Sequence, residues 1–189
     1  MTESFVSRKM RRGFNLFPAF RGTGGRVTYI AGDFREARLR LPLNWRTRNY
    51  VGTIFGGSLY GAVDPLYMIL LIKILGPGYV VWDKAATIRF LKPGRGTLYA
   101  RFSIEEEEIQ TIRRLLETAP SIDRIYKVEL ADAAGTVHAE VERRSTSERI
   151  CDLCLCFVIR AVYWRGAETC RSRRDRTRGI SASRTRRPR

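Results

Sequence analysis

The chain has 189 residues, and 44% of them are hydrophobic, which is ordinary for a globular protein and allows one domain with a real core. The net charge of +16 is not ordinary, and the excess is uneven: residues 1–143 hold 22 Lys and Arg against 15 acids, whereas residues 144–189 hold 13 Arg against 4 acids. There is no Gly-rich phosphate loop and no dinucleotide fingerprint, so these two classes of nucleotide-binding motif are excluded.

Hydrophobic periodicity predicts helices and strands in a definite order. Stretches of alternating apolar residues indicate strands, and stretches with a 3.6-residue period indicate helices. In chain order we expect a helix over 10–21, two strands within 26–43, a helix over 57–75, strands over 79–93 and 97–104, a helix over 105–119 and a hairpin over 124–142. This order favours an α+β fold with an antiparallel sheet and one central helix.

The expected central helix is the most apolar segment of the chain. Its run from Leu59 to Leu75 is interrupted by three residues that a membrane span would not favour, and it falls short of the roughly 20 residues that a span needs. We therefore interpret it as a buried core helix. Ser58 is available as its N-terminal cap, and Pro65 should bend it by removing one internal hydrogen bond.

Asp64 lies inside this apolar run, where an unpaired carboxylate would be costly. One interpretation is structural: the acid pairs with a nearby cation or caps backbone amides. The candidate cations are Arg46, Arg48, Lys73 and Lys84. The other interpretation is chemical, because a partly desolvated carboxylate can act as a general base or as a nucleophile.

The pattern Asn49-x-x-Gly52-x-x-x-Gly56-Gly57-x6-Asp64 resembles the helix-start motif of hotdog-fold thioesterases of the phenylacetate (PaaI) type. The longer strings LPLNWRTRNYVGTIFGGSLYGAVDP and YVVWDKAATIRFLKPGRGTLYARFSI resemble a narrower branch, the domain of unknown function 4442 family. The likeness spans about residues 10–142. It implies a hotdog fold, in which an antiparallel sheet wraps a long helix, usually in dimers, and it implies hydrolysis of acyl-coenzyme A or related thioesters.

The resemblance and the chemistry together assign roles in a candidate site. Asp64 would be the base or nucleophile, and the free backbone amides at Gly56 and Gly57 would stabilise the oxyanion. Asn49 would orient the water or the carbonyl; the alternative is an ordinary loop Asn that makes local backbone bonds. Asp83 would assist Asp64 or pair with its neighbour Lys84. The likeness is incomplete, because Phe55 stands where these thioesterases often have His, and Asp83 stands near the place of a Ser or Thr.

Geometry predicts that the site is shared between two subunits. Gly57 and Asp64 are seven residues apart, about 10 Å along one helix, so one helix cannot easily present both to one thioester. We therefore expect a homodimer or homotetramer with shared sites. A set of basic residues could hold the phosphates of coenzyme A, although it could also be an ordinary solvated face. The residues expected to bind substrate are Asp83, Lys84, Arg89, Lys92 and Arg95.

The lone His138 lies far from the motif in sequence, and we interpret it as structural. No metal or other cofactor is expected, and the location expected for the protein is cytoplasmic, because residues 1–143 lack cysteine and no signal peptide is visible. One alternative function is a non-catalytic hotdog module that binds an acyl chain or serves assembly.

Residues 144–189 do not match the family, and we expect them to be an Arg-rich, Cys-containing tail that is largely disordered after a hotdog domain over 1–143. The composition is also what a frame-shifted reading of a GC-rich gene would give. The cysteines Cys151, Cys154, Cys156 and Cys170 lack the paired spacing of a zinc site, so the metal reading is weak. Nucleic-acid binding through the tail is an unfavoured second alternative.

Overall fold

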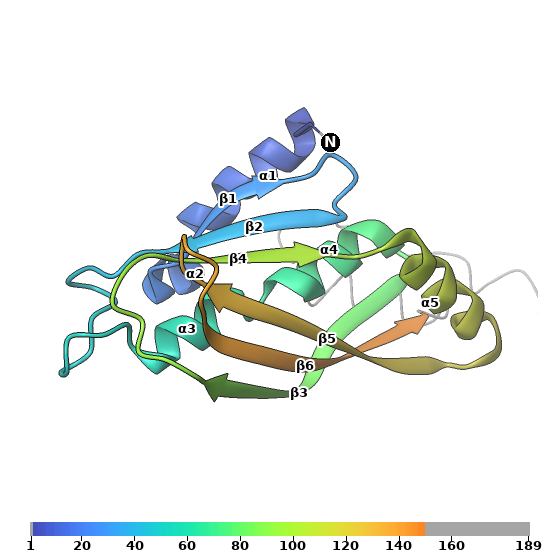
Figure 1. Ribbon diagram of the computed structural model, residues 1–189. Helices are drawn as coiled ribbons and strands as arrows, with labels where there is room; N and C mark the ends of the chain where they lie inside the picture. Colours follow the sequence, from blue (N-terminus) through green and yellow to red (C-terminus); the bar gives the residue numbers. More distant parts are fainter. Residues whose placement is uncertain (1, 150–189) are drawn as a thin grey trace, which may run out of the picture. The chain divides into compact units, whose positions relative to one another are not determined.

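In the computed structural model, which describes residues 2–149, a six-stranded antiparallel sheet wraps a central pair of helices (Figure 1). The helices are α1 (Phe5–Leu16), α2 (Pro18–Thr23), α3 (Gly56–Val63), α4 (Leu66–Leu75) and α5 (Glu106–Thr118). The strands are β1 (Arg26–Ile30), β2 (Glu36–Leu41), β3 (Tyr79–Phe90), β4 (Leu98–Ser103), β5 (Ser121–Ala131) and β6 (Val137–Arg149). This is the hotdog arrangement, and the predicted α+β fold class is confirmed.

The strands are ordered β1-β2-β4-β5-β6-β3 across the sheet. β5 and β6 form a long hairpin in which Val128 lies opposite Val141. β3 follows the central helix but pairs with β6 along almost its whole length, from Tyr79 opposite Arg149 to Phe90 opposite Ala139. Because the chain crosses over in this way, β1 and β3 become the two edges of the sheet.

Helices α3 and α4 form the core helix, and the Asp64-Pro65 pair separates them. Proline has no N–H to donate to the preceding turn, and the bend predicted at Pro65 divides the expected single helix into two. By length and composition Gly56–Leu75 could cross a membrane, but half of it is buried inside the domain, as in the core helix of a globular fold. The fully buried leucines of this segment each contribute about 1.5–3 kcal/mol of hydrophobic stabilisation. They include Leu66, Leu70 and Leu71.

The inner face of the sheet supplies the other half of the core. Along β4, buried residues alternate with exposed ones, so that Leu98, Ala100 and Phe102 face the helix. Tyr67 of α4 packs edge-on against Phe102 and stacks on Tyr126 of β5, with ring centroids 5.1 and 4.9 Å apart. These contacts fix the rotation of the central helix and hence the direction in which Asp64 points.

The two edge strands of the sheet, β1 and β3, differ in what covers their outer hydrogen-bonding groups. Asn15 of α1 bonds to both backbone groups of Val27, donating to its carbonyl and accepting from its N–H, each at 2.8 Å. Glu3 accepts a further bond from the Ile30 N–H. Helix α1 therefore occupies the hydrogen-bonding edge of β1, which blocks pairing with another chain there. Within residues 2–149 no strand or helix pairs with the outer edge of β3 in the same way.

Helix α5 is held against β5 by one acid. Glu108 accepts two bonds from the Arg124 guanidinium, at 2.8 and 2.5 Å, and one from the Tyr126 hydroxyl at 3.0 Å. The Arg124 hydrogen bonds are the largest influence on Glu108, and they hold the pKa of this carboxyl below its usual range. The buried stripe of α5 combines with this ionic contact to close the end of the core. The stripe residues are Ile109, Ile112 and Leu116.

Several sequence-based details were wrong. The N-terminal helix begins at Phe5, capped by reciprocal bonds between Ser4 and Ser7, and a second short helix follows at Pro18. Ser58 does not cap the central helix, because Phe55 is the cap residue and Ser58 is buried one turn inside.

β6 runs to Arg149 and so passes the expected domain boundary at residue 143. The cysteines and the remainder of the expected tail lie outside the described residues, and their assignment stays a prediction.

Candidate functional site

The start of α3 combines two glycines with two phenyl rings. The backbone N–H groups of Ser58 and Leu59 both donate to the Phe55 carbonyl. No side chain caps the start of the helix. The N–H groups of its first residues, Gly56 and Gly57, have no acceptor within the helix itself. These amides are the expected oxyanion donors.

Phenyl rings lie against both glycines. A Cβ at Gly57 would overlap the ring of Phe55, and one at Gly56 would lie 3.1 Å from the Phe90 ring. Both rings remain largely exposed. Glycines at a helix start leave it without side chains that would obstruct a substrate, but here the two rings occupy part of that space. The two glycines therefore leave room for the phenyl rings to pack at the helix start, as well as for a substrate to approach it.

Asp64 lies at the kink between α3 and α4, and its side chain is 45% exposed. Its Oδ1 accepts a hydrogen bond from Nη2 of Arg143 at 2.7 Å. The structural pairing that we considered therefore exists, but its partner is none of the four expected cations. The acid is also less buried than the apolar run suggested.

Arg143 is fully buried in the inward-facing row of β6, between positions occupied by Val141 and Ser145. The same Nη2 lies 2.8 Å from Oδ2 of Asp83, and Nη1 lies 3.4 Å from the carbonyl oxygen of Val63. Its Nε is buried without a partner among the described residues. One guanidinium therefore connects the kink between α3 and α4 to the edge strand β3. Its positive charge offsets the repulsion between the carboxylates of Asp64 and Asp83.

Tyr60 and Ser145 complete this cluster. Burial raises the pKa of the Tyr60 hydroxyl, and its hydrogen bond to Asp64, one helical turn away, raises it further. Ser145 donates to Oδ1 of Asp83 at 2.5 Å. Asp83, with only 18% of its side chain exposed, is thus engaged through both oxygens. It does not pair with Lys84, as one interpretation of the sequence had it.

Asn49 lies in a local turn and not in this cluster. Its side-chain amide donates to the Thr53 hydroxyl, and its side-chain oxygen accepts from the Thr53 N–H, both at 2.9 Å. Its backbone N–H also bonds to the Thr53 carbonyl. These bonds match the alternative that we gave for Asn49, a loop residue satisfied by its neighbours. They fix the loop that leads to Phe55 and the start of α3.

The basic residues expected to bind substrate follow β3 and the turn after it. Lys84 pairs with Asp123 at 3.0 Å, and Arg89 pairs with Glu140 at 3.5 Å, both on the surface. Lys92 and Arg95 are exposed and take part in no ion pair among the described residues. They are the most available cations of the set.

His138 is structural, as expected. One ring nitrogen lies 3.1 Å from the Pro93 carbonyl oxygen and the other 3.2 Å from Asp132. The hydrogen bond to His138 is the largest of the influences that lower the pKa of Asp132. The imidazole therefore ties the β5–β6 turn to the turn after β3.

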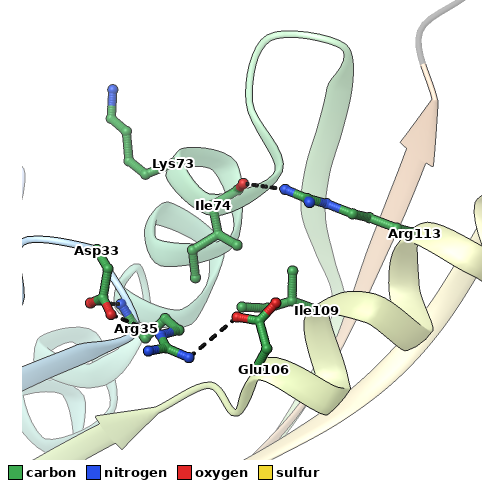
Figure 2. Close-up of a pocket in the computed structure, with 7 residues that line it drawn as sticks. All are labelled: Asp33, Arg35, Lys73, Ile74, Glu106, Ile109 and Arg113. Atoms are coloured by element: carbon green, nitrogen blue, oxygen red, sulfur yellow. Dashed lines mark hydrogen bonds and ion pairs between the residues drawn. The ribbon is translucent and has the colours of Figure 1, made fainter.

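A charged hollow of about 410 Å³ lies at the other end of α4 (Figure 2). Its ion pairs join Arg35 to Asp33 at 2.8 Å and to Glu106 at 3.2 Å, and Arg113 donates to the Ile74 carbonyl at 3.2 Å. These bonds link the β1–β2 turn, α4 and α5. The hollow contains none of the predicted site residues, and Arg35, its two acids and Arg113 are engaged in bonds that connect neighbouring elements.

The model of one protein family, described as a domain of unknown function (DUF4442), matches residues 6–146 of this sequence. The chain belongs to the DUF4442 family. The match extends beyond residue 143, in agreement with the length of β6. No curated protein matches the sequence.

Solved structures resemble this DUF4442 domain in fold. A Pseudomonas aeruginosa protein of unknown function, described as a probable thioesterase, superposes with a TM-score of 0.70 at 19% identity over 78% of this chain and 99% of its own. A Chlorobaculum tepidum protein of unknown function gives 0.63 at 17% identity over 77% and 95% of the two chains. A Haemophilus influenzae thioesterase gives 0.58 at 11% identity over 78% and 93%.

Sequence reasoning missed Arg143, which is the centre of the cluster in this DUF4442 chain. The signal was present: in β6 the apolar row Ala139 and Val141 continues to a charged residue at the next inward position. A charge in an inward row must be paired, and Asp64 is the acid in the facing helix. The predicted strand ended at residue 142, so Arg143 appeared to lie beyond the sheet.

Proposed function

We propose that this protein is a thioesterase-like hydrolase that acts on acyl-coenzyme A or another acyl thioester, with an active site shared across a homodimer and without a cofactor. The observation that carries the proposal is the state of Asp64: its carboxylate is held by Arg143 at 2.7 Å, yet almost half of the side chain is exposed. A fixed and accessible carboxylate can meet a substrate, whereas the enclosed Asp83 cannot do so without losing its partners.

The chemistry follows from the geometry of a thioester. Asp64 takes a proton from a water molecule while the water oxygen attacks the carbonyl carbon, or the carboxylate attacks that carbon directly. The carbonyl oxygen gains negative charge and would be stabilised by the free amides at Gly56 and Gly57. The carbon–sulfur bond then breaks. In the first case the proton taken up by Asp64 passes to the leaving thiolate. In the second case the thiolate leaves an anhydride on Asp64; water hydrolyses this anhydride, which releases the carboxylic acid, restores the carboxylate and supplies the proton for the thiolate. The alternatives of base and nucleophile both require Asp64 to be ionised.

Two features support a dimer with shared sites. Gly57 and Asp64 lie at opposite ends of α3, about 10 Å apart along its axis, which is too far for one carbonyl to meet both. In β3 the residues Lys84–Thr87 are consecutively exposed, so neither face of that part of the strand is fully covered. A second copy paired along β3 would cover it and would bring a foreign helix start near Asp64; a tetramer would pair two such dimers.

The basic residues Arg89, Lys92 and Arg95 lie next to Phe90, whose ring covers the start of α3. Coenzyme A carries several phosphate charges, and these side chains would hold them at the mouth of the site. Such a substrate occurs in the cytoplasm, where we place the protein. Lys84, which is paired with Asp123, would contribute less.

A second candidate is a non-catalytic hotdog module that binds an acyl chain. It is favoured by the rings of Phe55 and Phe90, which lie where a substrate carbonyl would reach the amides, and by the absence of His at position 55. In this case Asp64 would serve only to neutralise Arg143.

The experiment is hydrolysis of a panel of acyl-coenzyme A esters, from short to long and aryl, by the wild type, Asp64→Asn and the matched surface variant Asp33→Asn. Turnover on one class that falls at least about a hundredfold only in Asp64→Asn supports the hydrolase. No turnover on any ester, together with saturable binding of an acyl ligand, would replace it with the binding module.

A further inference from the structure

Helix α1 presents an outward side that the domain does not use. Its inward side carries Ser7, which is fully buried, and Phe14, whose ring centroid lies 4.3 Å from that of Phe20. The opposite side carries Phe5, Lys9, Arg12 and Leu16, spaced at i, i+4, i+7 and i+11, so these four side chains follow one line along the helix.

Large apolar side chains are exposed along and beside this line. Phe5 is 78% exposed and Leu16 is 69% exposed, and Phe17 at the corner between α1 and α2 is also exposed. Exposed residues of this size scattered singly are ordinary, but a run of them on one short helix and its corner marks an interaction surface.

Trp45 extends the surface at the α2 end. Its ring, 86% exposed, lies under the guanidinium of Arg46 at 5.9 Å. Arg46 in turn donates to the carbonyl of Arg21, one turn after Phe17 in α2. These contacts connect the aromatic loop residue to the helix corner. We call the surface formed by Phe5, Lys9, Arg12, Leu16, Phe17 and Trp45 the N-terminal docking face.

The sequence around this face is mostly basic. Residues 4–32 contain six Lys and Arg and no acid, and residues 37–63 contain four Arg and no acid. Glu3 neutralises Arg11, at 2.7 Å, but no ion pair among the described residues involves Lys9 or Arg12. A second copy of the same face would be repelled, so the complementary partner is anionic.

We propose that the N-terminal docking face binds the surface of an anionic lipid bilayer, with α1 lying in the plane of the interface. Phe5, Leu16, Phe17 and Trp45 would enter the boundary between headgroups and acyl chains, and Lys9 and Arg12 would reach lipid phosphates along their flexible stems. A nucleic acid would also satisfy the cations, but its phosphate backbone gives no reason for exposed Phe and Leu side chains between them. The inference is independent of the hydrolase chemistry.

The test is flotation of the full chain with phosphatidylcholine vesicles prepared with and without phosphatidylglycerol. The wild type should float only with the anionic vesicles. The double variants Leu16→Ser/Phe17→Ser and Lys9→Glu/Arg12→Glu should each lower the partition coefficient at least about tenfold. Two matched controls change exposed residues elsewhere, Ile125→Ser on β5 and Arg114→Glu on α5, and should bind as the wild type does.

Quenching of tryptophan fluorescence by lipids brominated in the acyl chain provides a second readout, which should be lost in Trp45→Phe. Flotation that is unchanged in both double variants would overturn the proposal and assign binding to the basic sequence after residue 149. No flotation of the wild type would also overturn it. Binding to an oligonucleotide that depends on Lys9 and Arg12 but not on Leu16 and Phe17, without vesicle binding, would assign the face to nucleic acid.

Discussion

Nη2 of Arg143 lies 2.7 Å from Oδ1 of Asp64, so a residue of β6 fixes the carboxylate at the kink of the central helix. Because Arg143 is completely buried, the contact connects the stability of the domain to the geometry of the candidate site. A buried guanidinium is tolerated only when carboxylates neutralise it, and two carboxylates at this range are tolerated only when a cation lies between them.

Replacing Arg143 should therefore destabilise the fold strongly. Arg143→Met removes the cation and leaves Asp64 and the enclosed Asp83 without their partner, which should lower the free energy of unfolding by about 3–5 kcal/mol. Urea denaturation measures the loss. The control is Arg144→Met, the exposed neighbour, which should change stability by less than about 0.5 kcal/mol. Equal effects in the two variants would contradict a special role of Arg143.

The protection of the β1 edge by α1 gives a second prediction. Asn15→Leu keeps the size of the side chain but leaves the N–H and the carbonyl of Val27 without their partners, which should cost about 1–3 kcal/mol. Hydrogen exchange of the Val27 amide should accelerate in the variant. Arg12→Leu, on the outward side of the same helix, is the control. Unchanged exchange at Val27 would show that the helix does not protect this edge.

Glu108 predicts a pH dependence. The Arg124 hydrogen bonds lower the pKa of Glu108 in the folded state, so its contribution to stability is present above the unfolded value of about 4.3 and is lost as the pH falls through the folded value. Glu108→Gln should lower stability at neutral pH by about 1–2 kcal/mol. The difference from the wild type should shrink as the pH falls below that unfolded value.

Thermal unfolding measured across this range checks the prediction, with the exposed Glu117→Gln as control. A difference between wild type and Glu108→Gln that stays constant down to the lowest pH would show that the ionised carboxylate is not the source of the stabilisation.

The exposed edge of β3 predicts the assembly. Ala86→Lys places a charge in the consecutively exposed part of β3, which should prevent edge-to-edge pairing and give a monomer. Light scattering after size-exclusion chromatography measures the mass. Ile125→Lys, at another exposed position, on β5, should leave the assembly unchanged. A wild type that is monomeric, or an Ala86→Lys variant that remains dimeric, would move the interface away from β3.

The sequence predicted the fold well where periodicity is strong. The alternation in β2 and β4 and the break at Pro65 are local signals, and each element that they predicted exists. The first helix was predicted to begin five residues too late because its first turn depends on the reciprocal bonds of Ser4 and Ser7, which hydrophobic periodicity does not report. The order of strands across the sheet was not predicted, since pairing between β3 and β6 is a long-range property.

The site was harder to predict because its centre depends on a contact between distant residues. Asp64 attracted attention as an acid in an apolar run, but its partner is 79 positions away and belongs to a strand that was expected to end earlier.

Asn49 was weighed as a positioning residue, and only the structure shows that both ends of its amide bond to Thr53. The phenyl rings at the start of α3 could not be foreseen, because Phe90 approaches Gly56 only after β3 has folded back.

The central claim is that Asp64 of one subunit and the Gly57 end of another act on the same thioester. Complementation between two inactive variants tests it most directly. Asp64→Asn removes the base, and Gly57→Leu obstructs the oxyanion amides, while the exposed Phe55 ring has room to move aside. Each variant alone should be inactive toward the acyl-coenzyme A ester that the wild type hydrolyses.

Co-expression of the two variants yields mixed dimers in which one of the two shared sites is intact. If subunits combine at random, the mixture should regain about one quarter of the wild-type turnover. A mixture that is no more active than its two components would contradict the shared site and place Asp64 and the glycines of one chain in separate roles.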